Sequence, residues 1–345
     1  MKVLFLYTQL AGYFGNCIEF LYKTHGADIK VIYYPQHASA PFKFELTGVS
    51  MMSKNAFLGN QLEEHCLSFA PDLVYVAGWV DKDYKKIARR LKERGTIVVS
   101  GLDNVWKGTL RQRLACIFSN ALIKPYFTYL WVAGHRQYQF ARRLGYSKEY
   151  ILTGLYSADV EKFMKVSRHA LQRRLIYVGR FEKVKGIEAL YDVFSSLTAE
   201  ERKGWTLDII GNGTLRELML STATIRIHAF MQPNDLIQFV ADAGGFILPS
   251  IDEPWGVVAQ EFAAAGKPLL LSSEVNSGEE YLIHGYNGYL FKSGDNEDLK
   301  AKLIKFFALD DETRRAMGNR SVELARRGEP KYWAAKLLSL VPNQN

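Results

Sequence analysis

The chain has 345 residues, of which 48% are apolar, 23% charged and 13% aromatic. This length predicts about two domains that each bury a core, and the composition excludes a disordered or collagen-like chain. No run approaches the roughly 18 to 20 uncharged apolar residues that a membrane-spanning helix needs, which excludes a multi-pass membrane protein. The three cysteines show no metal-ligand spacing, so we expect reduced thiols and neither a disulfide framework nor a zinc site.

The excess positive charge of the chain lies in its first half. Residues 1–165 hold 22 Lys+Arg and 13 Asp+Glu, a net charge of 22 − 13 = +9. Residues 166–345 hold 22 and 23, a net charge of 22 − 23 = −1. A basic half is typical of proteins that meet nucleic acid, an anionic membrane surface or a phosphorylated substrate. Improved solubility alone is the alternative explanation.

Short apolar runs alternate with amphipathic helical stretches along the chain. The strands predicted from these runs are 3–7, 29–34, 73–77, 96–100, 130–132, 151–153, 174–178, 206–210, 225–229, 245–248, 268–271 and 288–291. Continuous apolar strands separated by helices indicate parallel sheets covered on both faces. We therefore expect two Rossmann-like α/β domains, residues 1–165 and 166–328, that face each other across a cleft. Residues 329–345 carry a further amphipathic helix pattern.

The strongest motif spans residues 249–268 and reads PSIDEPWGVVAQEFAAAGKP. A predicted strand leads into a loop with Glu253, and Pro254 suits the start of a helix expected from Trp255 to Ala265. Free backbone amides at such a helix start bind anions. In this motif they belong to Gly256, Val257 and Val258.

Glu253 and Glu261 stand on either side of that anion site. They are eight residues apart, which is at most roughly 12 Å along a helix. This spacing matches a ligand with a sugar, a diphosphate and a ribose, in which one carboxylate binds the sugar hydroxyls and the other binds the ribose. The alternative is an acid favoured by the helix dipole and a solvated glutamate. The assembly as a whole favours the ligand site.

A second motif, YVGRFEKVKG, covers residues 177–186. A predicted strand ends at Gly179, and Arg180 and Lys185 flank the short loop that follows. Two cations at the carboxyl end of a strand can converge on a diphosphate, and open α/β sheets bind their ligands at that end.

Three weaker motifs carry less information. Gly12 and Gly15 are expected in a loop after the first strand, where glycine lets the backbone approach a diphosphate; a plain turn is the alternative. The G-x-G at residues 211–213 lacks the third glycine of a dinucleotide site and predicts a tight turn. Asp81 and Asp83 form a D-x-D pattern typical of metal sites, but they precede a basic helix, so we predict helix capping and no metal.

These motifs resemble glycosyltransferase family 4, the retaining enzymes of the GT-B fold, over residues 174–325. The resemblance implies that Arg180 and Lys185 bind the diphosphate of the donor, that Glu253 contacts the donor sugar and that Glu261 contacts the ribose. It also implies that the backbone around Phe230 and Met231 meets the base. The amides of Trp255, Gly256, Val257 and Val258 would contact the sugar and the phosphate.

The first half resembles the family less. Members often carry a histidine in the cleft of this domain, but the loop after the predicted strand 96–100 reads GLDNVW and has none. Asp103 is the candidate that replaces it in part. The resemblance further implies that the terminal helix with Trp333 returns to the first domain.

The resulting hypothesis is a retaining hexosyltransferase that uses a UDP- or GDP-sugar, with no cofactor or metal, in cell-envelope polysaccharide biosynthesis. A basic helix at 84–94 and a basic–aromatic segment at 106–127 suit an anionic membrane surface, so we expect a glycan or lipid-linked glycan acceptor and no nucleic acid. A soluble acceptor is the alternative.

No signal-peptide cleavage site follows the first apolar run, so we expect a cytoplasmic protein, which would lie at the inner face of the membrane if it is peripheral. A nucleotide-sugar epimerase and a two-lobed small-ligand binding protein are the competing functions.

Overall fold

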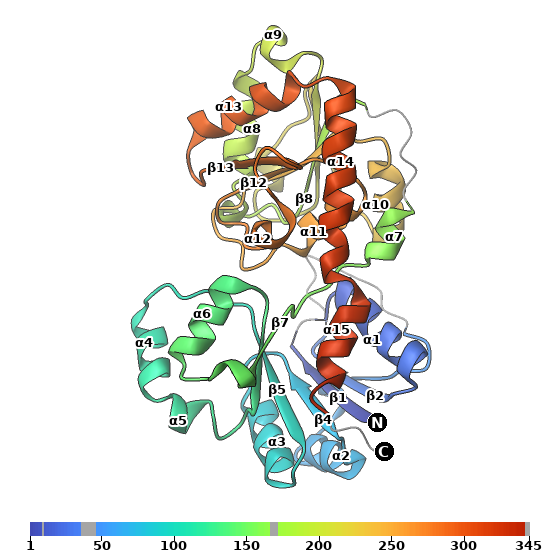
Figure 1. Cartoon of the computed structure of the whole chain (residues 1–345), viewed down its shortest axis with the longest axis vertical. Helices are drawn as coiled ribbons and strands as arrows, with labels where there is room; N and C mark the ends of the chain where they lie inside the picture. Colours follow the sequence, from blue (N-terminus) through green and yellow to red (C-terminus); the bar gives the residue numbers. More distant parts are fainter. Residues whose placement is uncertain (9, 36–45, 166–171, 342–345) are drawn as a thin grey trace. The chain divides into compact units, whose positions relative to one another are not determined.

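The computed structural model describes residues 1–8, 10–35, 46–165 and 172–341. The chain divides into two compact units (Figure 1). The N-terminal unit comprises Met1–Ser157 and the segment that starts at Pro330, and the C-terminal unit comprises Ala158–Glu329. The sequence-predicted boundary between residues 165 and 166 adjoins residues outside the described part of the chain and stays a prediction. No helix of the described residues is long and apolar enough to span a membrane.

The N-terminal unit contains a parallel sheet of seven strands in the order β3-β2-β1-β4-β5-β6-β7. The strands are β1 Lys2–Tyr7, β2 Asp28–Tyr33, β3 Ser50–Ser53, β4 Leu73–Val76, β5 Ile97–Leu102, β6 Tyr129–Val132 and β7 Ile151–Thr153. The helices are α1 Gly12–His25, α2 Gln61–Phe69, α3 Lys82–Glu93, α4 Leu110–Ile117, α5 Ser119–Leu122, α6 His135–Arg143 and α15 Pro330–Leu338. All six predicted strands of this half are present. The edge strand β3 was missed, because its sequence, Ser-Met-Met-Ser, has no β-branched residue and only two apolar positions.

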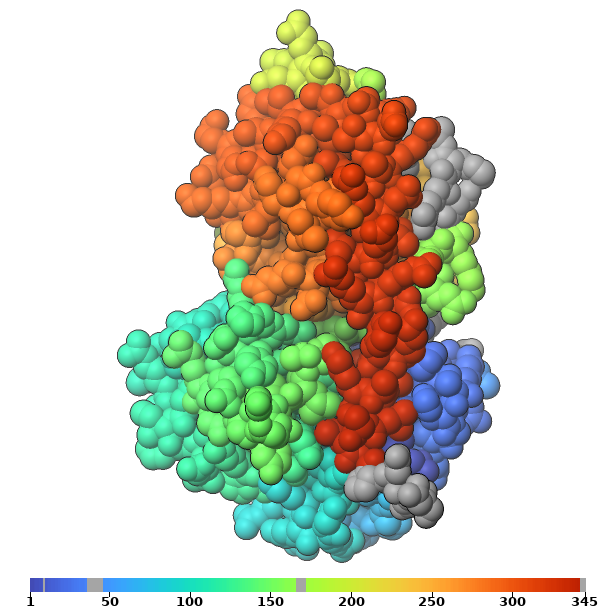
Figure 2. Space-filling model, in the orientation of Figure 1, coloured from blue at the N-terminus to red at the C-terminus, as the bar shows by residue number. Residues whose placement is uncertain are grey.

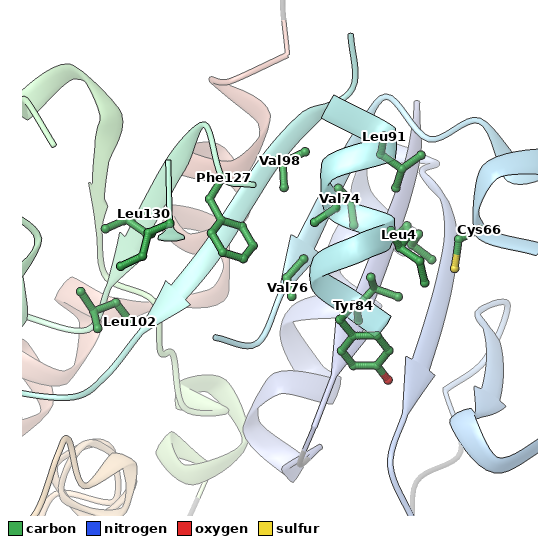
Figure 3. Packing of buried hydrophobic residues seen from close by; sticks show 14 of the residues in the cluster. Leu4, Cys66, Val74, Val76, Tyr84, Leu91, Val98, Leu102, Phe127 and Leu130 are labelled. Carbon is green, nitrogen blue, oxygen red and sulfur yellow. The ribbon is translucent and has the colours of Figure 1, made fainter. Parts of the chain in front are cut away.

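One hydrophobic cluster of this unit forms where α3 covers the sheet (Figure 3). Val74, Val76 and Val98 point from the strands toward Tyr84 and Leu91 of the helix, and all five are buried. Burying one such aliphatic side chain stabilises a fold by about 1.5–3 kcal/mol. The basic helix therefore contributes one apolar face to the core, and its charges stand on the opposite face.

The C-terminal helix α15 is anchored in the N-terminal unit by one tryptophan. Trp333 is 2% exposed, stacks on Trp131 with ring centroids 4.9 Å apart, and meets Phe14 edge-on at 5.5 Å. Its indole Nε1 donates a hydrogen bond to the carbonyl of Leu155 at 3.0 Å. This packing explains why the last described helix belongs to the same unit as the first strand.

The C-terminal unit contains a parallel sheet of six strands in the order β10-β9-β8-β11-β12-β13. The strands are β8 Arg174–Val178, β9 Thr206–Ile210, β10 Ile225–His228, β11 Gly245–Leu248, β12 Leu269–Ser272 and β13 Gly288–Phe291. The helices are α7 Val160–Met164, α8 Ile187–Ser196, α9 Ala199–Arg202, α10 Pro233–Val240, α11 Val257–Ala264, α12 Gly278–Tyr281, α13 Asn296–Phe307 and α14 Asp311–Ala325. All six strands predicted for this half are present.

Each sheet reverses its strand order once. The reversal lies between β1 and β4 in the N-terminal unit and between β8 and β11 in the C-terminal unit. Open α/β sheets bind ligands beyond the carboxyl ends of the strands at such a switch point. Ligands are therefore expected at the loops after β1 and β4 and at the loops after β8 and β11.

Candidate functional site

Two loops meet at the switch point of the C-terminal unit. One follows β8 and ends in a short 3-10 turn, Lys183–Lys185, and the other follows β11 and includes residues 250–256. The backbone amides of Ile251 and Asp252 both donate to the carbonyl of Val184, at 2.8 and 3.2 Å. These bonds hold the second loop against the turn of the first, and they bring Lys185 to Glu253.

Lys185 and Glu253 form an ion pair that is largely removed from water. The Lys185 Nζ lies 2.6 Å from Glu253 Oε2, and each side chain is 11% exposed. The hydroxyl of the fully buried Ser250 donates to the same carboxylate oxygen at 3.1 Å. A buried pair needs such extra hydrogen bonds, because the attraction between the charges must offset the loss of hydration. The carboxylate is thus fixed in one orientation.

The loop that carries Glu253 is also held from its other side. Asn276 Nδ2 donates to the carbonyl of Glu253 at 2.9 Å and to that of Pro254 at 3.2 Å. The hydroxyl of Ser277 donates to the carbonyl of Gly256 at 2.9 Å. These contacts use the backbone carbonyls of residues 253, 254 and 256 and none of the loop's amides.

Helix α11 begins at Val257, two residues later than predicted. The preceding Gly256 has φ 90°, in the left-handed region, and a Cβ placed there would lie 3.0 Å from Glu253 Cγ. This turn ends the loop, so Pro254 and Trp255 cannot continue into the helix. Within the described part of the chain, no hydrogen bond is donated by the amides of residues 256–258, which form the expected anion site.

Trp255 contributes a buried side chain beside that helix start. It is 4% exposed, and its indole Nε1 has no hydrogen-bond partner among the described residues. Its ring meets Tyr281 edge-on, with centroids 6.4 Å apart. A buried donor without a partner costs free energy, so this indole is held there at some expense to stability.

Arg180 follows Gly179 in the loop after β8, and its side chain is exposed. Its guanidinium makes no hydrogen bond or ion pair with the described residues, whereas its carbonyl accepts from the hydroxyl of Tyr177 at 2.9 Å. Burial, and next the charge of Glu253, raise the pKa of Tyr177, while Arg180 acts to lower it. Both charges therefore act on the same phenol at the end of β8.

The glycine pair at residues 211–213 supports the Arg180 loop. A Cβ on Gly211 would lie 1.9 Å from the carbonyl oxygen of Gly179, so only glycine allows this approach. The amide of Phe181 donates to the carbonyl of Asn212 at 2.9 Å. The predicted tight turn is confirmed, and it positions the backbone that carries Arg180.

The remaining predicted donor contacts come from two other elements. Glu261 lies on α11 and is half-buried, and burial, then the charge of Asp159, raise its pKa to about 7, while Lys162 acts to lower it. Phe230 and Met231 are half-buried in the loop between β10 and α10. One strand, β9, separates β10 from β8, so this loop lies at the same edge of the sheet as Arg180.

The N-terminal unit has a pocket at its own switch point. It has a volume of about 540 Å³ and is lined by residues after β1, β4 and β5, among them Tyr13, Trp79 and Asp103. Asp103 directly follows β5, and its Oδ2 accepts a hydrogen bond from the hydroxyl of Tyr156 at 3.0 Å. Burial, and then neighbouring Tyr13 and Asp103, raise the pKa of Tyr156 well above its usual value, so its phenol stays protonated.

Two of the weaker sequence expectations have different outcomes. The loop expected at Gly12 and Gly15 is wrong. Helix α1 begins at Gly12, and Gly15 is buried in its first turns. The helix forms here because it lets Phe14 pack against Phe5 in the core. The capping of α3 is confirmed, since Asp81 accepts from the amide of Tyr84 at 2.7 Å and pairs with Lys54 at 2.6 Å. The described residues contain no cluster of three or more possible metal ligands.

Comparison with known proteins places the C-terminal unit in a family. Residues 159–323 match the family model described as "Glycosyl transferases group 1". This stretch is a glycosyl transferases group 1 domain. Glycogen synthase from Mycobacterium tuberculosis is 35% identical over 123 residues, 33% of this chain and 29% of that protein. Sulfoquinovosyl transferase SQD2 from Arabidopsis thaliana is 31% identical over 169 residues, 47% of this chain and 31% of that protein.

The match to these curated relatives thus spans about a third of their length. The fold match covers the whole chain: HepE from Anabaena, solved in complex with UDP and glucose, superimposes over 99% of both chains with a TM-score of 0.73 at 15% identity. The predicted fold class is confirmed, because both parallel-sheet units have the fold of GT-B glycosyltransferases. Assignment to family 4 within that fold stays a prediction.

Three polar residues of the group 1 domain were missed by sequence reasoning. Ser250 and Asn276 orient Glu253, as described above. Gln260 is fully buried; its Oε1 accepts from the amide of Ala158 at 2.8 Å, and its Nε2 donates to the carbonyl of Gly328 at 2.9 Å. It joins the two ends of the C-terminal unit. Ser250 and Gln260 stand close to the two glutamates of the motif, whereas Asn276 lies outside it and had no sequence signal.

Proposed function

We propose that this protein is a glycosyltransferase that moves a sugar from a nucleoside diphosphate sugar to an acceptor hydroxyl. The observation that carries the proposal is the geometry at the β8–β11 switch point. There Lys185 and Glu253 are fixed at 2.6 Å from each other, next to a helix start whose amides have no partner in the described residues. This combination offers a cation, a carboxylate and amide donors to one ligand.

The proposed donor is a UDP- or GDP-sugar. Arg180, Lys185 and the amides of residues 256–258 bind its diphosphate, Glu253 binds sugar hydroxyls and Glu261 binds the ribose. The backbone at Phe230 and Met231 meets the base. The complexes of HepE with UDP and with UDP-glucose support this class of donor.

In the proposed reaction the bond between the sugar C1 and the diphosphate oxygen breaks, and a bond between C1 and the acceptor oxygen forms. The acceptor proton passes to an oxygen of the departing diphosphate, and nucleoside diphosphate is released. Arg180 and Lys185 stabilise the charge that develops on the leaving group, and such electrostatic stabilisation usually contributes most to the rate. They supply what a divalent metal supplies elsewhere, so we propose metal-independent transfer. The resemblance to glycosyltransferase family 4 is the reason that we also propose retention of configuration.

The proposed acceptor is a glycan or a lipid-linked glycan of cell-envelope polysaccharide synthesis, made in the cytoplasm. The pocket of the N-terminal unit supports this choice, because aromatic rings such as Tyr13 and Trp79 offer flat apolar faces to a sugar. Asp103 offers a carboxylate oxygen to an acceptor hydroxyl in the same pocket. The hydrogen bond from Tyr156 keeps that carboxylate in place.

A panel of nucleotide sugars, incubated with and without glycan acceptors, tests the proposal. Acceptor-dependent release of nucleoside diphosphate supports it. Conversion of the donor without acceptor would indicate an epimerase, and binding without turnover would indicate a binding protein; either result contradicts transferase activity. A thermal-shift screen with UDP, GDP and ADP selects the donors, since a ligand that binds only the folded state raises its stability.

A further inference from the structure

Helices α4 and α5 carry a row of large apolar side chains that face solvent. We call this row the α4–α5 ridge; its members are Leu110, Leu114, Ile117, Phe118 and Leu122. Leu110 is 73% exposed and Ile117 is 71% exposed. The segment, teal in Figures 1 and 2, lies at the outer surface of the N-terminal unit.

The exposure of the ridge is concentrated on one face. Leu110, Leu114 and Ile117 follow a spacing of four and three residues, which places them on one side of α4. Ala115 and Cys116 on the other side pack against the core. Among the described residues, 17 large apolar side chains are exposed, and five of them fall within these 13 residues. Scattered exposure is ordinary, but a continuous row marks an interaction surface.

The charge around the ridge indicates the kind of partner. Residues 104–148 contain eight Lys+Arg and no Asp or Glu. Arg111 on α4 is exposed and makes no hydrogen bond or ion pair with the described residues. On α3, by contrast, Lys86 and Arg90 already pair with Glu63, at 2.6 and 3.2 Å. The chain around the apolar row thus carries positive charge and no acidic residue, a combination typical of helices that lie in an anionic lipid interface.

Helix α4 also borders the pocket of the N-terminal unit. Thr109, Arg111 and Gln112 line that pocket, while Leu110, Leu114 and Ile117 face outward. We propose that the α4–α5 ridge inserts into the headgroup region of an anionic bilayer, so that the pocket receives an acceptor whose lipid tail stays in the membrane. The choice of acceptor rests on the proposed function, whereas the contact with the bilayer does not.

Co-sedimentation with vesicles tests the proposal. The full chain is mixed with vesicles of phosphatidylcholine alone or of phosphatidylcholine with phosphatidylglycerol, at low and at high salt. We expect binding to the anionic vesicles only, weakened by salt because screening reduces the attraction. The double variant Leu110→Ser, Ile117→Ser should bind these vesicles on the order of tenfold more weakly, because it loses the side chains that enter the interface.

Leu58→Ser combined with Leu218→Ser is the matched control, because these leucines are 75% and 70% exposed elsewhere on the surface. The control should bind vesicles like the wild type, and UDP binding by calorimetry should be unchanged in both double variants.

Absence of salt-sensitive vesicle binding by the wild type, or equal vesicle binding by the ridge variant and the wild type, would overturn the inference. A wild-type dimer in light scattering that the ridge variant makes monomeric, without vesicle binding, would instead assign the ridge to a second copy. If the wild type bound neither UDP nor GDP, that result would contradict the proposed function and leave the vesicle result standing.

Discussion

Lys185 and Glu253 are 68 residues apart in the chain, and their charged atoms lie 2.6 Å from each other. The loops after two adjacent strands, β8 and β11, bring them together, and Ser250 completes the hydrogen bonding of the carboxylate. The pair has a structural and a chemical consequence. Lys185 neutralises a buried acid, and both groups are held in place before a ligand arrives.

Lys185→Ala is expected to destabilise the C-terminal unit by about 2–4 kcal/mol, because it leaves the carboxylate of Glu253 buried without its cation. The combined variant Lys185→Ala, Glu253→Gln should recover much of that loss. Urea denaturation of the wild type, both single variants and the double variant measures the coupling between the two residues. Additive effects of the two changes would show that the pair contributes little to stability.

Arg180→Ala should separate binding from stability. The side chain is exposed, so the free energy of unfolding should change by less than about 0.5 kcal/mol. Loss of a charge-assisted contact to the diphosphate should weaken UDP binding by about 2 kcal/mol, or roughly thirtyfold. Lys183→Ala, an exposed cation in the same loop, is the matched control and should leave the affinity unchanged. Equal affinity of both variants by calorimetry would remove Arg180 from the donor site.

The sequence predicted the sheets well and the contacts within the site less well. Twelve strands were predicted because continuous apolar runs indicate buried strands, whereas β3 was missed because none of its residues is buried and only two of them are apolar. The motif located Glu253, but nothing in it indicates a partner 68 residues away, since such pairing depends on strand order. The loop prediction at Gly12 failed for a related reason: local glycine content was outweighed by the packing of Phe14.

The raised pKa of Glu261 makes stability depend on pH. Burial, and then Asp159, raise this pKa from its ordinary 4.5 to about 7, so the folded protein holds the proton more tightly than the unfolded chain. Stability should therefore fall as pH rises from about 4.5 to about 7, and the loss should be complete above that range.

Glu261→Gln removes this titration. The variant should match the wild type near about pH 4 and be more stable near about pH 8, as denaturation at both values would measure. Glu323→Gln, an exposed glutamate on α14, is the control. Glu261→Gln should also bind UDP more weakly than the wild type above about pH 7, where the ionised carboxylate of Glu261 accepts hydrogen bonds from the ribose hydroxyls. A difference in stability that is independent of pH would contradict this account of Glu261.

Asp103→Asn should affect transfer more than donor binding. The substitution keeps an oxygen for the Tyr156 hydrogen bond and removes the charge that faces the acceptor pocket. We expect kcat to fall by about 10²-fold while the affinity for UDP stays unchanged. Tyr156→Phe should lower kcat less, because it loosens the carboxylate without removing it. Wild-type kcat in Asp103→Asn would show that this residue only supports the pocket wall.

The central claim is that the residues at the β8–β11 switch point bind a nucleoside diphosphate sugar. Determination of the structure with such a donor bound tests it most directly. The account predicts the diphosphate within hydrogen-bond distance of the amides of residues 256–258 and of Arg180 and Lys185, with a sugar hydroxyl on Glu253. A donor bound elsewhere in the protein, with Lys185 and Glu253 undisturbed and not in contact with it, would contradict the claim.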